Sequence, residues 1–210
     1  RFLDLEGSKC ADLAPLAALA DLRFLNLEGT NTTDLTAVAD FTELRYLNLS
    51  GAAIADISPV IALRKLKHLD LSLVPASEFS ALAQLPKLTD LWLSGTEVTD
   101  LQPLSALSRL ETLDISETKV SDLVPLSRLS NLSYLDLTGT LVSDLEPLQK
   151  LKRLDDLLIG LSQVTDLSPM RKQIKKGLEM VVYDCKLENP PQEIAEQGRK
   201  AILKFWKSAE

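Results

Sequence analysis

The stretch LETLDISETKVSDLVPLSRLSN occupies residues 110–131, and residues 132–153 repeat its pattern as LSYLDLTGTLVSDLEPLQKLKR. Both copies fit L-x-x-L-x-L-x-x-T-x-V-x-D-L-x-P-L-x-x-L-x-x. Copies in the same register begin at Leu22, Leu44, Leu66, Leu88, Leu110, Leu132 and Leu154, and a partial copy precedes them. A fixed period of 22 residues predicts a solenoid, because each copy can bury its apolar side only against its neighbours.

The alternation inside each copy predicts one short strand. The fourth and sixth positions are apolar, as at Leu113 and Ile115, and such alternation places one side of a strand inward. Proline recurs at the sixteenth position, where it disfavours a long helix on the return path. We therefore expect an α/β fold, with about eight or nine parallel strands on a concave face and short helical or 3₁₀ turns on the convex face.

This pattern resembles the leucine-rich-repeat family, and the resemblance covers roughly residues 1–188. It implies a right-handed, curved solenoid over residues 1–188. Residues 189–210 lie outside the period and are expected to form a separate C-terminal capping or linker helix.

Two polar ladders run through the copies. Aspartate recurs at the thirteenth position and a hydroxyl at the ninth, where the family commonly has asparagine. Each aspartate precedes a turn, so we interpret it as a helix cap in preference to a metal ligand. The hydroxyls are expected to hydrogen-bond the turn backbone, and this departure from asparagine resembles a bacterial subclass.

The tail after the repeats has the pattern of one amphipathic helix. Pro190 and Pro191 favour a helix start, and Asn189 is a candidate cap. The apolar stripe consists of Ile194, Ala195, Ala201, Ile202, Phe205 and Trp206. Since the last repeat of a solenoid needs a cover, this helix is expected to cap it.

The tail has the sequence LENPPQEIAEQGRKAI over residues 187–202. This motif is similar to the junction in Roco proteins, where leucine-rich repeats precede a Roc GTPase domain. The resemblance implies a regulatory domain of a bacterial Roco protein in the cytoplasm, whose GTP binding and hydrolysis would reside in Roc-COR domains. Residues 1–210 contain no G-x-x-x-x-G-K-[ST] loop for phosphate. They also contain no nucleophile motif and no cluster with metal-ligand spacing. We expect neither enzyme activity nor a cofactor from this chain itself.

Charge narrows the class of partner. The net charge is −7, and the acidic excess lies in residues 1–170, whereas residues 171–210 are basic on balance. An acidic body argues against nucleic acid or an anionic membrane as the partner, because both require a basic footprint.

The predicted binding surface comprises the third, fifth and seventh positions of each copy, which point away from the core. These twenty-seven positions hold nine carboxylates, one histidine and no lysine or arginine, although the chain contains 23 basic residues. In the last copy we expect Met180, Val182 and Asp184 at these positions. The candidate protein-binding residues are Phe24, Tyr46, His68, Asp70, Asp90, Trp92, Asp114, Tyr134 and Asp136.

Two functional hypotheses follow. The main one is a protein-binding regulatory module that holds a basic surface, such as the Roc-COR domains of the same Roco protein. The alternative is a secreted or surface recognition domain similar to internalins. A homodimer is also expected if the first strand leaves an open edge.

Overall fold

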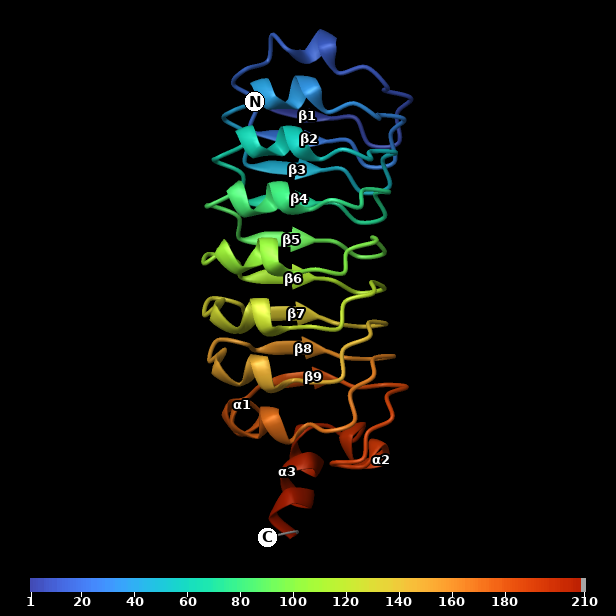
Figure 1. Cartoon of the computed structure of the whole chain (residues 1–210), viewed down its shortest axis with the longest axis vertical. Coiled ribbons are helices and arrows are strands. Elements are labelled where there is room, and N and C mark those ends of the chain that lie inside the picture. The colour runs from blue at the N-terminus through green and yellow to red at the C-terminus, as the bar shows by residue number, and fades with distance from the viewer. Residues whose placement is uncertain (209–210) are drawn as a thin grey trace.

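The computed structural model describes residues 1–208. Nine strands lie side by side in chain order in one parallel sheet (Figure 1). They are β1 (Phe2–Asp4), β2 (Phe24–Asn26), β3 (Tyr46–Asn48), β4 (His68–Asp70), β5 (Asp90–Trp92), β6 (Thr112–Asp114), β7 (Tyr134–Asp136), β8 (Asp156–Leu158) and β9 (Glu179–Val181). The predicted solenoid with its parallel sheet is confirmed.

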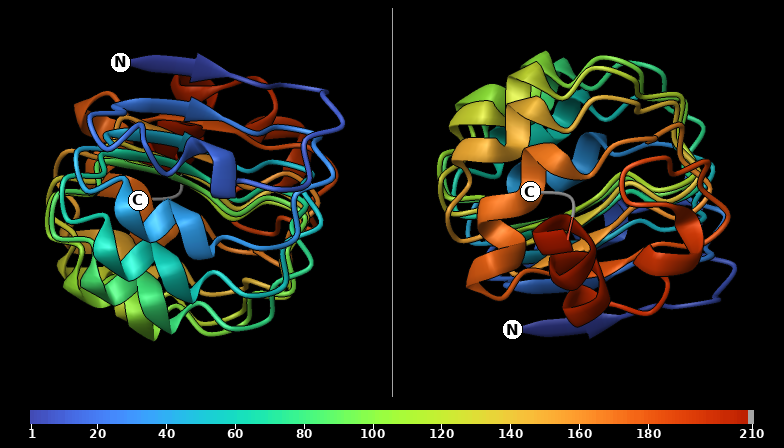
Figure 2. Two further views of the ribbon diagram at one scale, coloured as in Figure 1. Left: turned by 90° about the horizontal axis from the view of Figure 1, so that it is seen from above. Right: turned by 90° about the horizontal axis from the view of Figure 1, so that it is seen from below.

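The return path of each copy contains a short 3₁₀ turn, also as predicted. The turns are η1 (Ala14–Leu16), η2 (Thr36–Asp40), η3 (Ser58–Ala62), η4 (Ser80–Gln84), η5 (Gln102–Ala106), η6 (Val124–Arg128), η7 (Glu146–Lys150) and η8 (Ser168–Met170). Viewed along the long axis, the strands occupy one side of the coil and the turns the opposite side (Figure 2). The turns η2 and η4 lack proline, so proline is not required for this geometry.

The core is a continuous column of leucine and other aliphatic side chains between the sheet and the turns. Leu113 and Ile115, the fourth and sixth positions of one copy, are fully buried. The same positions of the neighbouring copies are buried too, so that apolar rows run along the solenoid. This packing confirms that each copy is covered by the next.

Both polar ladders serve the backbone. Seven aspartate carboxylates each accept a hydrogen bond of 2.8 Å from the first amide of the following turn. They are Asp12, Asp34, Asp56, Asp100, Asp122, Asp144 and Asp166. Each lies one residue before the formal N-cap, which is a leucine or isoleucine. Four buried threonine hydroxyls, from Thr30, Thr96, Thr118 and Thr140, donate to the carbonyl oxygen three residues earlier.

The aspartate ladder is broken at Glu78, whose carboxylate makes no hydrogen bond within residues 1–208. Glu78→Asp should place an acceptor near the amide of Ser80 and raise the free energy of unfolding by about 1 kcal/mol. Asp122→Ala should lower it by about the same amount, while Asp122→Asn should change it little because the amide oxygen still accepts. Urea denaturation measures all three, and no gain from Glu78→Asp would contradict this account of the ladder.

The tail forms two helices instead of the single one predicted. Helix α2 (Gln192–Ala195) and helix α3 (Arg199–Ser208) are separated at Gly198, whose φ of 84° interrupts the helical backbone. Of the predicted stripe, Ala195, Ile202 and Trp206 are buried, and Phe205 packs against the core from a half-buried position. The expected apolar cover is therefore present, but it is bent.

Asn189 does not cap a helix, contrary to the prediction. Its side-chain oxygen accepts a 3.0 Å hydrogen bond from the indole of Trp206, and its amide donates to Asp166 over 2.9 Å. The guanidinium of Arg171, in helix α1 (Arg171–Lys176), lies 5.6 Å from the centre of the Trp206 ring. Asn189 thus joins α3 to the last aspartate of the ladder.

Candidate functional site

The outward side chains of the nine strands form one surface, which we call the sheet face. It comprises the third, fifth and seventh positions of each copy. Its nine predicted binding residues, Phe24, Tyr46, His68, Asp70, Asp90, Trp92, Asp114, Tyr134 and Asp136, are all half-buried on it. The parallel pairing brings them together in rows across the strands.

An aromatic row follows the third position through the first four strands. The rings of Phe2 and Phe24 are stacked with centroids 4.0 Å apart, and those of Phe24 and Tyr46 are stacked at 4.2 Å. The His68 ring is tilted and lies 6.1 Å from Tyr46. In-register strands place one side chain directly beside the next, which explains the stack.

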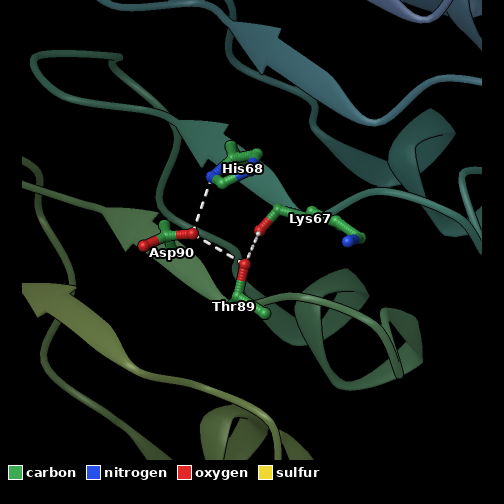
Figure 3. Close-up of polar contacts among 4 residues, drawn as sticks. All are labelled: Lys67, His68, Thr89 and Asp90. Atoms are coloured by element: carbon green, nitrogen blue, oxygen red, sulfur yellow. Dashed lines mark hydrogen bonds and ion pairs between the residues drawn. The ribbon is translucent and has the colours of Figure 1, made fainter. Parts of the chain in front are cut away.

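The row changes from aromatic to acidic at His68. Its Nδ1 lies 2.6 Å from Oδ2 of Asp90, which is its partner on β5 (Figure 3). The Thr89 hydroxyl lies 2.6 Å from the same oxygen and 3.1 Å from the Lys67 carbonyl oxygen. These contacts fix the orientation of the Asp90 carboxylate beside His68.

The fifth position has a structural role that sequence reasoning missed. Six aspartate or asparagine side chains there accept a hydrogen bond from the backbone amide two residues later, over 2.8–3.1 Å. They are Asp4, Asn26, Asn48, Asp70, Asp114 and Asp136. Aspartate and asparagine are equivalent in this role, so the hydrogen bond does not account for the choice of a charged residue.

Trp92 lies between Asp70 and Asp114 in this row. Burial raises the pKa of Asp70, and the negative charges of Glu28 and Asp114 raise it further, although hydrogen bonds from Ser72 oppose the shift. Burial also raises the pKa of Tyr134, with contributions from Asp136, Asp114 and Asp156. The neighbouring carboxylates thus add to the effect of burial on both groups.

The last strand departs from the predicted register. Glu179 and Val181 pair with Asp156 and Leu158, so the last copy is one residue longer than the period. Glu179, Val181 and Tyr183 therefore lie on the sheet face, in place of the predicted Met180, Val182 and Asp184. The added helix α1 accounts for the extra residue. The face still holds nine carboxylates and no lysine or arginine.

A second charged row was missed because it lies at the second position, outside the predicted surface. Arg1, Arg23, Arg45 and Lys67 are exposed there beside the first four strands, whereas Glu111 and Asp155 take that position beside β6 and β8. Reading the second position down the repeats could have revealed the change of sign. The negative charge of this side of the solenoid is thus concentrated from β5 onward.

Comparisons with known proteins agree with this geometry. The family model described as Leucine Rich repeats (2 copies) matches residues 86–128 and 108–150. The chain folds as a leucine-rich-repeat solenoid. The internalin InlF structure from Listeria monocytogenes is similar with a TM-score of 0.82 and 29% identity, over 88% of this chain and 54% of the other. This chain thus spans about half the length of InlF.

Two further Listeria monocytogenes structures are similar to this leucine-rich-repeat solenoid. Internalin C2 gives a TM-score of 0.81 and 28% identity, over 86% of this chain and 80% of the other. The functional domain of InlJ gives 0.65 and 21%, over 88% and 43%, and supports the fold alone. No curated protein matches the chain. The comparisons lend no support to the Roco resemblance of the tail.

Residues 1–208 of the leucine-rich-repeat solenoid contain no group of three or more His, Cys, Asp or Glu residues placed to hold a metal ion. None of its helices has the length and apolar character needed to cross a membrane. The sheet face is the surface on which the sequence pattern and the geometry converge.

Asp70→Asn should stabilise the protein at neutral pH. A raised pKa means that folding disfavours the carboxylate, whereas the asparagine oxygen can still accept from Ser72 as Asn48 does from Ser50. The gain should be present above the pKa that Asp70 has in the folded protein. It should disappear as the pH falls below the unfolded value of 3.8. Thermal unfolding of both proteins between pH 7 and pH 3 tests this, and a constant difference would contradict it.

Gly160 lies beneath the ring of Tyr183. A Cβ atom at Gly160 would overlap that ring, and the backbone of Gly160 does not have a positive φ. Gly160→Ala should therefore lower the free energy of unfolding by about 1–3 kcal/mol in the wild-type background. It should cost far less in a Tyr183→Ala background. Denaturation of the four proteins of this double-mutant cycle measures the coupling, and equal costs in both backgrounds would show that the ring does not rest on Gly160.

Proposed function

We propose that this chain is a protein-recognition module whose sheet face binds a basic protein surface, as a secreted or surface-exposed domain of the internalin-like kind. The observation that carries the proposal is the charge of that face, with nine carboxylates and no lysine or arginine among its outward positions. Adjacent strands lie ~4.8 Å apart, so these carboxylates act together on an approaching partner. The half-exposed Tyr46, Trp92 and Tyr134 supply the aromatic contacts on which binding free energy concentrates.

The similarity to internalins supports the extracellular alternative more than the Roco hypothesis. The sequence motif at residues 187–202 remains the one observation behind the Roco candidate. In that candidate function, the module would act in the cytoplasm and bind the Roc-COR part of a GTPase. Packing already explains one residue of this motif, because the side-chain oxygen of Asn189 accepts a hydrogen bond from the indole of Trp206. The coding sequence on either side of residues 1–210 distinguishes the candidates: a secretion signal supports the first, and a G-x-x-x-x-G-K-[ST] loop the second.

Selection of binders from a displayed library of small folded domains tests the use of the sheet face. The wild-type chain is the bait, and binders are then screened against Tyr134→Ala and against Asp114→Asn with Asp136→Asn. The proposal expects most binders to be basic and to weaken on both variants. If the selected binders contact the 3₁₀ turns by hydrogen exchange, and tolerate both variants, the sheet face is not the recognition surface.

Self-association is a further proposal, based on the exposed edge of β1. Phe2 is 65% exposed there, and β1 pairs on one side only, with β2. Light scattering across a range of concentrations tests for a dimer. A constant monomer mass at millimolar protein would rule this association out.

A further inference from the structure

The fifth-position row departs from its structural role in three strands. Asp or Asn caps the backbone in six strands, but Trp92, Leu158 and Val181 occupy the same position in β5, β8 and β9. An indole ring or an aliphatic side chain cannot accept the hydrogen bond that the six polar residues accept. Each departure therefore forgoes a backbone contact and turns an apolar side chain outward, which folding alone does not favour.

Two of these departures belong to a continuous apolar patch, which we call the apolar end and define as Leu158, Leu161, Val181 and Tyr183. Leu158 pairs with Val181, and the amide of Leu161 donates to the carbonyl of Tyr183 over 2.9 Å. Leu161, Val181 and Tyr183 are 46%, 47% and 41% exposed. Large apolar side chains that are grouped and exposed mark binding surfaces.

The apolar end continues directly into a cluster of carboxylates. Asp114 and Asp136 precede Leu158 and Val181 in the same row, on β6 and β7. Asp90 and Asp156 flank them in the neighbouring row. From β6 to β9 the fifth position thus reads acidic, acidic, apolar, apolar.

The dimensions of this strip fit a helix. Three residues of strand give it a width of ~10 Å, and the strands are spaced ~4.8 Å apart. An α-helix is about 10–12 Å wide and presents one side chain per ~5.4 Å turn along a stripe. Over the three intervals between four strands, the helical turns and the strand spacing therefore differ by about 2 Å in total. Alternate side chains of an extended peptide are ~6.8 Å apart and would run out of register by about 6 Å.

We propose that the sheet face from β6 to β9 binds one amphipathic α-helix of a partner protein. The contacting stripe of that helix carries two basic residues, over Asp114 and Asp136, followed by two apolar residues over Leu158 and Val181. This inference rests on the proposed function and names the partner of the same face. The carboxylates supply charge complementarity, and the apolar end fixes which end of the stripe lies at β9.

The test uses the whole chain and synthetic helices. The probe is a labelled, alanine-rich peptide of about 20 residues with Lys, Lys, Leu and Leu at successive stripe positions three or four residues apart. A second peptide of identical composition alternates the order as Lys, Leu, Lys, Leu. Fluorescence anisotropy gives the dissociation constant of each, and circular dichroism confirms that both are equally helical.

Two double variants divide the surface. Asp114→Asn with Asp136→Asn removes charge but keeps the backbone hydrogen bonds, and Leu158→Ser with Val181→Ser removes the apolar end. The matched controls on the turns are Asp40→Asn with Glu146→Gln, and Ile61→Ser with Val124→Ser, all of them exposed positions. Thermal unfolding verifies that each variant folds.

The wild-type chain should bind the ordered peptide at least tenfold more tightly than the alternating one. Each sheet-face variant should bind the ordered peptide at least tenfold more weakly than the wild-type chain does. The control variants should bind it with unchanged affinity. Equal binding of the two peptides, no binding of either, or an unchanged affinity of Leu158→Ser with Val181→Ser would overturn the helix proposal. The broader proposed function is tested independently by the library selection. It is contradicted only if the selected binders do not contact the sheet face.

Discussion

Deletion of residues 192–210 should lower the melting temperature by about 10 °C, because burying the indole of Trp206 alone contributes about 3 kcal/mol. Trp206 is 5% exposed and Ile202 is 2% exposed, so their loss uncovers the last repeat. The guanidinium of Arg199, which donates to the carbonyls of Ile174 and Lys175, is lost as well. In a solenoid, the terminal repeat is stabilised from one side by its neighbour and depends on such a cover.

Point variants locate the source of this stability. Trp206→Ala should account for most of the loss, and Asn189→Ala should cost about 1 kcal/mol through its two hydrogen bonds. Lys204→Ala, at an exposed position of the same helix, is the matched control. Differential scanning calorimetry measures all four proteins. A melting temperature unchanged by the deletion would show that α3 contributes nothing to the solenoid.

Replacement of Asp114 and Asp136 by lysine should reduce the association rate of a basic partner at least tenfold at low salt and weaken its salt dependence. The change reverses the sign of the field at the centre of the sheet face, where no compensating basic side chain lies. Because lysine also removes the acceptors for Ser116 and Thr138, Asp114→Asn with Asp136→Asn is the control that alters charge alone. Stopped-flow kinetics with a library-selected binder gives the rates.

Trp92→Ala should change the dissociation rate of the partner. As a half-exposed indole between two carboxylates, it should hold the bound partner, so its loss should speed dissociation about 30-fold, equivalent to about 2 kcal/mol. The association rate should stay nearly constant. If the lysine variant changes only dissociation and Trp92→Ala changes only association, the assigned roles are wrong.

The period of the sequence predicted most of the fold. Apolar residues at the fourth and sixth positions specify the strands, and the aspartate before each turn specifies where the turn begins. The prediction failed where the period does. Assigning Met180 to the third position placed the last strand two residues beyond the strict period, whereas the structure adds only one residue, so Glu179 and Val181 lie outward. The apolar stripe of the tail predicts one helix, but the positive φ of Gly198 divides it into α2 and α3.

The sequence predicted which side chains lie on the sheet face, but not the contacts that they make there. Alternation along each strand determines which side chains point outward, so Trp92 and His68 could be assigned to the sheet face correctly. The repeat pattern does not reveal which individual residues contact one another. The bond between Asp114 and the amide of Ser116, and the exposed cluster around Tyr183, depend on local backbone geometry and on the register of β9. The basic row at Arg23 and Arg45 was visible in the sequence but lies outside the positions considered.

The equivalence of aspartate and asparagine in the fifth-position row has a consequence for how this surface can evolve. Since either residue caps the same amide, as Asn48 and Asp70 do, one nucleotide change can add or remove a charge without altering the fold. A lineage can therefore change which partners the module attracts while its folding remains under separate selection. The same exchange offers protein engineers a set of sites at which affinity and specificity can be adjusted in steps of one charge.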